Sequence, residues 1–400
     1  MAKIDDSVKK KVPELRFKGF TDDWEERKLS DIADRFDNLR VPITASDRKS
    51  GDTPYYGANG IQDYVEGFTH DGEFILVAED GANDLKNYPV QYVNGKVWVN
   101  NHAHVLQGKN TITDNKFLMN SIKNFNIEPF LVGGGRAKLN ADVMMKLNIL
   151  LPTFDEQEKI GSFFSLLDDT IALHQRKLDL LKEQKKGYLQ KMFPKNGAKV
   201  PELRFAGFAD DWEDRKLSSI AERVTRKNKN NESTLPLTIS AQDGLVDQND
   251  YFNKQVASRD VTGYFLVKNG EFAYNKSYSN GYPWGAIKRL DKYEMGVLST
   301  LYIVFKPTAI NSQFLVSYYE TTRWYREVSK NAAEGARNHG LLNISPNDFF
   351  NTLLTIPKSA EEQQQIGSFF KQLDDTIALH QRKLDLLKEQ KKGFLQKMFV

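Results

Sequence analysis

The chain has 400 residues, of which 40% are hydrophobic and 12% aromatic; this predicts two or three domains with ordinary cores and excludes a mainly disordered chain. Lysine and arginine number 56 against 53 aspartates and glutamates, giving a formal charge of +3. Binding to nucleic acid would therefore need local patches, because the bulk charge is too small. Cysteine is absent, which excludes disulfide scaffolds, thiolate zinc sites and cysteine nucleophiles.

The sequence carries no sign of export or of membrane insertion. Its N-terminal stretch lacks the apolar core of a secretory signal peptide. No apolar run approaches the ~20 residues that a membrane-spanning helix needs. We therefore expect a cytoplasmic protein with no membrane partner.

Two segments of the chain occur twice. Residues 11–36 recur as residues 199–224 with 20 of 26 positions identical, and residues 160–193 recur as residues 366–399 with 31 of 34 identical. The stretches between these copies show no comparable similarity. Ends that stay alike around middles that differ predict one shared task for the ends and two different tasks for the middles. Uneven drift after a recent duplication is the alternative.

The repeat predicts the order of the domains. Each half begins with a short opening motif, continues into a variable body and ends in a long helix. The predicted parts are a first domain 11–151 with opening motif 11–36 and body 37–150, a helix 155–194, a linker 195–199, a second domain 200–357 with opening motif 199–224 and body 225–356, and a helix 361–400.

Both bodies are predicted to be α+β domains with much loop surface. Stretches rich in β-branched and aromatic residues predict strands, and Gly-Asn pairs predict the turns between them. The predicted strands are residues 74–80 and 97–107 in the first body and residues 271–278 and 298–306 in the second.

Each of the two long helices carries one narrow apolar seam. Its apolar residues recur in steps of four and three, which is typical of a helix that packs against another helix. We expect the two helices to cover each other. The seam positions are Ile160, Phe164, Leu167, Ile171, Leu178 and Leu181 in the first helix, and Ile366, Phe370, Leu373, Ile377, Leu384 and Leu387 in the second.

Polar residues within the seams favour an antiparallel pair. A parallel pair in register would place His174 against His380 and Lys185 against Lys391, which buries like charges face to face. An antiparallel pair instead puts Lys185 opposite Leu373 and lets the lysines extend to water. We therefore predict the antiparallel arrangement.

The antiparallel register that we expect matches Ile160 with Met398 and relates the two halves by an approximate two-fold axis. A helix of the 34 repeated residues spans ~51 Å, which exceeds the ~34 Å of one DNA turn. The pair is thus long enough to act as a rigid ruler between two DNA readers.

Polar, basic and aromatic residues gather at the predicted turns of both bodies. Arginine pairs with guanine and asparagine or glutamine with adenine, while tyrosine, serine and lysine position phosphates. The alternative is that the tyrosines pack and the Gly-Asn pairs only form turns. The candidate DNA-binding residues are Tyr55, Tyr56, Asn59, Gln62, His102, His104, Arg136, Lys138, Lys276, Ser277, Tyr278, Tyr282, Arg337, Asn338 and His339.

Catalytic motifs are absent from the sequence. It contains no phosphate-binding loop, dinucleotide fingerprint, metalloprotease helix motif or nucleophile elbow, and no Asn/Asp-Pro-Pro-aromatic motif of amino methyltransferases. We therefore expect no catalytic residue. His102 and His104 would share one strand face, but no third ligand can be named. Packing or hydrogen bonding is thus favoured over zinc binding, and no metal is expected.

Three motifs and their order point to one known family. The chain combines the duplication with an ELRF-x-GF-x-x-x-W opening, the stretch NNHAHVLQ and a helix start LP-x-x-x-EQ-x-x-I. In this arrangement it resembles the specificity subunit of type I restriction-modification systems over nearly its whole length. The helix start comprises Leu151, Pro152, Glu156, Gln157 and Ile160; its second copy, with one extra residue after the proline, comprises Ile356, Pro357, Glu362, Gln363 and Ile366.

The resemblance implies an α+β fold. Two target recognition domains of mixed α/β structure would be separated by two long helices that pair as an antiparallel coiled coil with pseudo-two-fold symmetry. Each domain would read one half of a bipartite, asymmetric site in double-stranded DNA, and the coiled coil would set the spacer.

The resemblance also implies the partners. The subunit would be non-catalytic and would bind no cofactor itself. It would direct two adenine methyltransferase (M) subunits, which use S-adenosylmethionine and flip the target base, and restriction and translocase (R) subunits, which use ATP and magnesium.

Two other functions are compatible with the sequence. A coiled-coil adaptor that binds only proteins predicts that the assembled complex protects no DNA sequence. A nuclease with a hidden metal site predicts DNA cleavage by the purified chain with magnesium alone.

Overall fold

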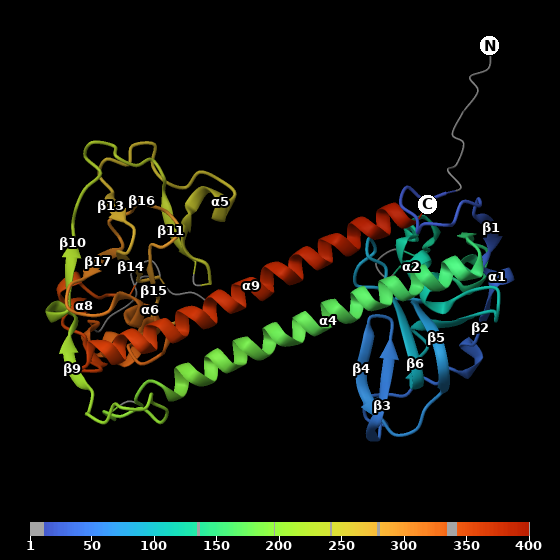
Figure 1. Ribbon diagram of the computed structural model, residues 1–400, viewed down its shortest axis with the longest axis horizontal. Coiled ribbons are helices and arrows are strands. Elements are labelled where there is room, and N and C mark those ends of the chain that lie inside the picture. The colour runs from blue at the N-terminus through green and yellow to red at the C-terminus, as the bar shows by residue number, and fades with distance from the viewer. Residues whose placement is uncertain are drawn as a thin grey trace, which may run out of the picture. The chain divides into compact units, whose positions relative to one another are not determined.

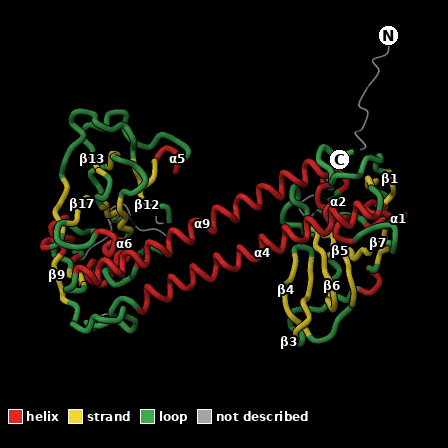
Figure 2. The backbone as a smooth tube through the Cα atoms, viewed as in Figure 1, coloured by secondary structure: helices red, strands yellow, loops and turns green. Residues whose placement is uncertain are grey.

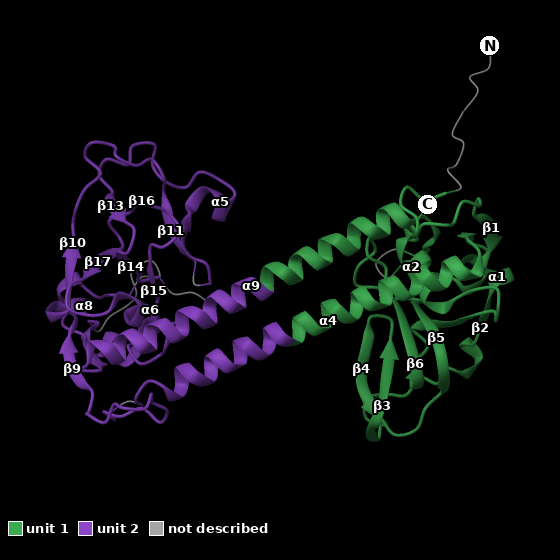
Figure 3. Ribbon diagram, viewed as in Figure 1, with its two compact units in different colours: residues 1–176, 381–400 green, residues 177–380 purple. Residues whose placement is uncertain are grey.

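The chain forms two compact units, each of which contains one body and part of both long helices. The computed structural model describes residues 12–133, 137–195, 197–240, 242–277, 281–333 and 342–399 (Figure 1). Unit 1 comprises residues 1–176 and 381–400, and unit 2 comprises residues 177–380 (Figure 3). Within the described residues, no helix combines the length and the apolar character of a membrane span.

Unit 1 is built on a six-stranded sheet covered by a short helix. Neighbouring strands are antiparallel except β3 and β6, which run parallel. The helix α2 (Asn115–Asn124) buries Phe117, Leu118 and Ile122 in one core with Ile75 and Leu106 of the sheet. The strand order is β2 (Ala33–Arg35), β7 (Ala103–Gly108), β5 (His70–Ala78), β6 (Val90–Val99), β3 (Ser50–Gly57) and β4 (Gly60–Val65).

Short elements close unit 1 at both ends of its body. A separate antiparallel pair joins β1 to β8, so the opening motif is hydrogen-bonded to the segment that leads into the first long helix. These elements are β1 (Glu25–Lys28), α1 (Leu29–Ile32), η1 (Asp37–Leu39), η2 (Glu128–Phe130), α3 (Ala141–Met144) and β8 (Asn148–Leu151).

The described residues of unit 2 form a four-stranded sheet and three two-stranded sheets. Short helices such as α5 and α6 lie among these strands (Figure 2). The sheet order is β10 (Ala221–Val224), β17 (Ile303–Pro307), β14 (Phe272–Asn275) and β15 (Ala286–Arg289). The strand pairs are β9 (Glu213–Lys216) with β18 (Leu353–Ile356), β11 (Leu237–Ser240) with β12 (Gly244–Asp247), and β13 (Phe265–Lys268) with β16 (Met295–Leu298). The helices are η3 (Leu217–Ser219), α5 (Gln248–Phe252), α6 (Ser312–Glu320), α7 (Tyr325–Asn331) and α8 (Pro346–Phe350).

The mixed α/β character of both bodies is confirmed, but two of the predicted strand ranges also include a turn. Residues 97–107 contain the end of β6, a turn and then β7, because the Asn100 side chain accepts a hydrogen bond from His102 N at 2.8 Å and bends the chain. Residues 298–306 likewise hold a turn between β16 and β17, where Tyr302 N donates to Ser299 O at 3.2 Å.

The long helices are α4 (Phe154–Lys191) and α9 (Ala360–Met398), close to the predicted 155–194 and 361–400. The seam positions Leu167, Ile171, Leu373 and Ile377 are partly buried, and the other eight predicted seam residues are buried. At their N-terminal ends the seams merge with the cores of the bodies. Phe164 packs with Phe399 in unit 1, and Phe370 packs with Phe193 in unit 2.

Contacts within each unit show that α4 and α9 are antiparallel, as predicted. In unit 1 the Phe163 and Phe394 rings are 5.1 Å apart, and Lys391 pairs with Asp168. Higher residue numbers in α4 thus lie beside lower residue numbers in α9. The same contacts recur in unit 2 with the copies exchanged, where the Tyr188 and Phe369 rings are 5.0 Å apart and Lys185 pairs with Asp374 at 2.5 Å.

The seam lysines do not extend to water, contrary to the prediction. The side chains of Lys185 and Lys391 are only 16% and 15% exposed. Lys185 contacts Glu320 at 2.7 Å as well as Asp374, and although burial opposes it, these two carboxylates raise the pKa of Lys185. The lysines stay buried because a carboxylate on the facing helix forms an ion pair with each ammonium group and stabilises its charge.

The Lys391–Asp168 pair gives a direct test of the antiparallel register. Lys391→Asp places two carboxylates together and should lower the free energy of unfolding by about 1–2 kcal/mol. The double exchange Lys391→Asp with Asp168→Lys restores opposite charges and should recover most of this loss in urea unfolding. A double variant that is no more stable than Lys391→Asp would contradict the register.

Candidate functional site

Each opening motif is bound to the start of a long helix by a two-pronged ion pair. Arg16 donates from Nε and Nη2 to the two oxygens of Glu156 at 2.7 and 2.8 Å, and Glu156 is fully buried. Arg204 binds Glu362 with the same two distances, and Glu362 is 1% exposed. The hydrogen bond that Arg16 donates to Glu156 raises the pKa of Arg16. The arginine of ELRF and the glutamate of the helix start are therefore one structural unit.

The glutamine that follows this glutamate in each long helix is hydrogen-bonded to the backbone of the body. Gln157 accepts a hydrogen bond from Asp114 N at 3.0 Å and donates to Pro152 O at 2.9 Å. Gln363 does the same in unit 2, accepting from Asn311 N at 2.9 Å and donating to Pro357 O at 2.9 Å. Asp114 and Asn311 are the N-caps of α2 and α6. Both bodies are thus attached through the start of an equivalent short helix.

A glycine in each long helix lets this short helix approach closely. A Cβ atom added to Gly161 would lie 2.3 Å from Asp114 Oδ1 and 2.9 Å from Phe117 N. A Cβ on Gly367 would lie 2.7 Å from Phe314 N. Any side chain at these positions would push the N-terminus of α2 or α6 away from the long helix. The repeated glycine is therefore a packing residue.

Removal of the buried arginine should destabilise unit 1 strongly. Arg16→Ala leaves Glu156 charged and buried, at a cost of about 3–5 kcal/mol in the free energy of unfolding. Arg204→Ala should cost less, because Trp212 Nε1 still donates to Glu362 at 3.2 Å. Urea unfolding of both variants measures the difference.

The matched control is Arg27→Ala. Arg27 lies in the same opening motif and pairs with Glu25 at 2.8 Å, but its side chain is 52% exposed. This variant should change the stability by less than about 1 kcal/mol. Equal losses for Arg16→Ala and Arg27→Ala would show that burial of the carboxylate does not matter.

Several candidate DNA-binding residues of the first body have internal roles. Tyr55 is 1% exposed, and its hydroxyl donates to Ile43 O at 3.3 Å. Asn59 is exposed, but its side chain donates to Gly81 O and accepts from Asn83 N. The position of Tyr55 removes it from the set of surface candidates, because β3 directs it into the core rather than to the turn.

Four further candidates of the first body, Tyr56, Gln62, His102 and Lys138, are partly buried or exposed. Tyr56 is half-buried and Gln62 is exposed on β4. The prediction that His102 shares a strand face with His104 is wrong. His102 lies in the turn before β7, where its Nδ1 is 2.6 Å from Asp80 Oδ1. Lys138 is 46% exposed and pairs with Glu79 at 2.9 Å. Arg136 lies outside the described residues.

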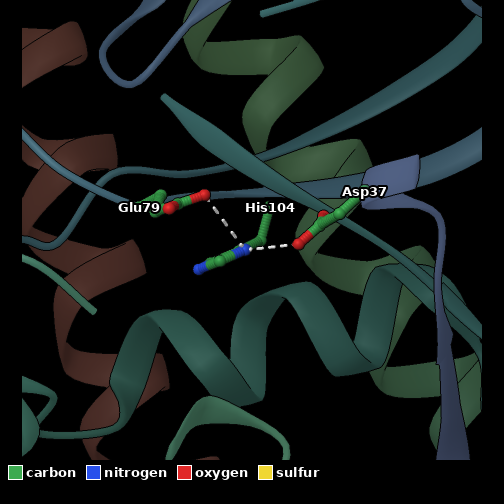
Figure 4. Close-up of side chains that lie close together, drawn as sticks. All are labelled: Asp37, Glu79 and His104. Carbon is green, nitrogen blue, oxygen red and sulfur yellow. Dashed lines mark hydrogen bonds and ion pairs between the residues drawn. The ribbon is translucent and has the colours of Figure 1, made fainter. Parts of the chain in front are cut away.

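His104 is the centre of a buried polar cluster with Asp37 and Glu79 (Figure 4). Its Nδ1 lies 2.7 Å from Asp37 Oδ2 and 3.6 Å from Glu79 Oε2, and its Nε2 lies 2.8 Å from Leu139 O. Because the Leu139 carbonyl oxygen can only accept a hydrogen bond, Nε2 donates to it, and Nδ1 faces the Asp37 carboxyl group. His104 is 1% exposed and therefore stands as a structural residue of unit 1 rather than as a DNA contact.

The cluster has three side chains of the metal-binding types, but cations already hold its carboxylates. Arg40 Nη1 lies 2.7 Å from Glu79 Oε2, and Lys138 binds the other oxygen of the same carboxylate. Arg40 also lies 3.5 Å from Asp37. The arrangement thus fits an ion-pair network, and the donor set does not fit a metal.

The network lowers the pKa of both carboxyl groups. Burial alone would raise the pKa of Asp37, but the hydrogen bond and charge of His104, with smaller effects of Val105 N and Arg40, lower it below 3.8. Burial likewise opposes the shift of Glu79, whose pKa Lys138 and Arg40 lower below 4.5. Each carboxylate therefore stabilises the fold as long as it is charged.

This pH dependence can be measured with Asp37→Asn. The folded-state pKa lies below the ordinary value, so the stabilisation is complete above about pH 5 and is lost as the pH falls through the folded-state pKa. Asp37→Asn should lower the free energy of unfolding by about 1–3 kcal/mol at pH 7. The difference in Tm between wild type and variant should shrink below about pH 4. A difference that is constant down to pH 3 would contradict the assignment.

Three candidates of the second body, Lys276, Ser277 and Tyr282, lie within the described residues. Lys276 is half-buried, and its Nζ lies 3.4 Å from Ile344 O; burial lowers its pKa. Ser277 N donates to Asn275 Oδ1 at 3.0 Å, and Tyr282 lines two cavities. Outside the described residues lie Tyr278, Arg337, Asn338 and His339.

Two cavities that share part of their lining lie in unit 2. One, of about 770 Å³, lies between β11, the turn that follows it, α5 and the end of β14. The other, of about 550 Å³, lies between α4, β15 and the segment that joins α6 to α7. Gln242, Gln248, Tyr251 and Phe252 line the first cavity and were not among the sequence candidates. No local motif marks them, because strand pairing brings them together.

Comparisons with known proteins agree with this architecture. The chain matches the family described as type I restriction modification DNA specificity domain over residues 21–183 and 209–389. A protein of Haemophilus influenzae, named as a type I restriction enzyme specificity subunit, is 46% identical over 149 residues, which are 37% of this chain and only 38% of that protein. The MjaVIII specificity subunit of Methanocaldococcus jannaschii is 22% identical over 412 residues, covering 94% of this chain and 91% of that protein.

A solved structure shares the whole fold. The crystal structure of the type I restriction-modification S subunit from M. genitalium matches with a TM-score of 0.67 at 15% identity. The match covers 97% of this chain and 99% of that chain. Two bodies and two long helices are therefore an arrangement that a distantly similar sequence also adopts.

Proposed function

Because the chain belongs to the family of type I restriction-modification DNA specificity domains, we propose that its two bodies each read one half of a bipartite, asymmetric site in double-stranded DNA. The chain itself is non-catalytic in this role and binds no cofactor. The DNA target also accounts for the predicted cytoplasmic localisation.

One observation carries the proposal. The two bodies have different sheets, yet each is attached by the same arginine–glutamate pair, the same glutamine and the same glycine. A scaffold that repeats its attachment contacts while it varies what it attaches is suited to presenting two different recognition surfaces. An adaptor with one repeated partner would gain nothing from two different bodies.

The long helices supply the spacing between the two readers. Each helix passes through both units, and α4 with 38 residues spans ~57 Å. Ion pairs fix the register in both units, through Lys391 with Asp168 and through Lys185 with Asp374. In this proposal the paired helices set the length of DNA that is left unread.

Exposed apolar residues on the long helices suit a repeated protein partner. Leu173 and Leu180 of α4 are 66% and 53% exposed, and their copies Leu379 and Leu386 of α9 are 59% and 51% exposed. Exposed leucines that occur at the same place in both copies favour two identical partners. In the family these are the two methyltransferase (M) subunits, which use S-adenosylmethionine, joined by ATP- and magnesium-dependent restriction (R) subunits.

Lengthening both helices tests the spacing. One heptad is inserted after Arg176 and one after His380, which adds ~10 Å to each helix. Methylation mapping in cells that also contain the methyltransferase should show the same two half-sites separated by about three more base pairs. An unchanged spacer would contradict the ruler, and absence of any bipartite methylated sequence with the wild-type chain would contradict the proposed function.

A further inference from the structure

The cavity of about 770 Å³ in unit 2 combines amides with an exposed aromatic edge. Gln242 lies in the turn between β11 and β12, and Gln248 is the first residue of α5. Tyr251 and Phe252, at the end of α5, are 52% and 44% exposed, and their rings meet edge to face at 4.9 Å. Two adjacent aromatic side chains that remain exposed beside polar groups indicate a binding surface.

The cavity is held in shape by hydrogen bonds that leave two amide groups available. Ser240 donates to Asp243 Oδ2 at 2.8 Å, and Asn275 accepts from Ser277 N. Gln248 N donates to Pro236 O at 2.8 Å, which fixes the backbone that carries its side chain. Within the part of the chain that the structure describes, the side-chain amides of Gln242 and Gln248 make no hydrogen bond. Both can therefore bind a ligand without breaking an internal contact.

The neighbouring cavity brings positive charge to the same surface. The two cavities share Gln242, Tyr282 and Ala286, so they are neighbours. The second cavity is lined by Lys182 and Lys186 of α4, both exposed. Amides beside exposed lysines are the combination that base edges and phosphates of one DNA segment require.

We propose that Gln242 and Gln248 read an A·T base pair in the half-site of the second domain, with Lys182 and Lys186 on the adjoining phosphates. A glutamine amide offers one donor and one acceptor, which match N7 and the N6 amino group of adenine in the major groove. The exposed Tyr251 and Phe252 supply apolar contact for the thymine methyl group. This inference rests on the proposed function and adds which residues of unit 2 determine the sequence.

The test compares three single variants in the complete complex with its methyltransferase subunits. Gln242→Ala and Gln248→Ala remove the two amides, and Gln255→Ala is the matched control, because Gln255 is exposed in the loop after α5 but does not line the cavity. Methylation mapping should show that discrimination at an A·T position of one half-site falls on the order of tenfold in at least one of the two cavity variants. The other half-site should be unchanged, and Gln255→Ala should behave as wild type.

The outcomes separate the inference from the function on which it rests. Full discrimination in both cavity variants, with a bipartite site still methylated, would overturn the inference and leave the proposed function intact. An equal loss of methylation at all sequences, in variants with wild-type Tm, would also overturn it, because phosphate contacts weaken binding uniformly whereas base contacts relax one position. Failure of the wild-type complex to methylate a bipartite site would refute the proposed function itself.

Discussion

The buried arginine–glutamate pair is the contact on which each unit depends. A carboxylate that is at most 1% exposed must keep its partner, because an isolated buried charge costs several times more than the pair. Arg16 and Glu156 are 140 residues apart in the sequence, and Arg204 and Glu362 are 158 apart. Each pair therefore joins the two ends of a body and closes it on the long helix. What lies between the joined ends can change without disturbing the scaffold.

The bodies use this freedom differently. Unit 1 has one six-stranded sheet, whereas unit 2 divides its strands between a four-stranded sheet and smaller pairs. Even beside the common contact the two units differ, since Trp212 donates to Glu362 but Trp24 Nε1 finds no partner among the described residues. The short helices α2 and α6 share their capping and their approach to a glycine, yet at equivalent positions they carry Lys123 and Glu320. The constant part of each body is thus limited to the surface where it meets the long helices.

The fold was largely predictable, and the candidate site was not. The seam positions, the antiparallel direction and the α+β bodies could be predicted from hydrophobic periodicity and from the internal repeat. Both features can be recognised in the linear sequence without knowledge of the fold. Tyr55 was expected at a turn and His104 on a strand face, and both were candidate DNA contacts, but pleating of β3 and β7 turns them into the core. The lysines of the seam were expected in water, whereas carboxylates of the facing helix bind them. These errors concern the surroundings of a side chain, whereas the error for His102 concerns its element, because it lies in the turn before β7 and not on a strand.

The sequence by itself determined that the chain contains repeated segments around two bodies that differ, and that its long helices pair. These conclusions need only repetition and spacing, which are properties of the linear chain. Tertiary structure alone decided that the repeated arginine, glutamate and glutamine hold the bodies in place, and that Gln242 and Gln248 share one cavity. The physical reason is that burial and hydrogen bonding depend on strands and helices that are far apart in sequence, so the role of a polar residue is set by its neighbours in space.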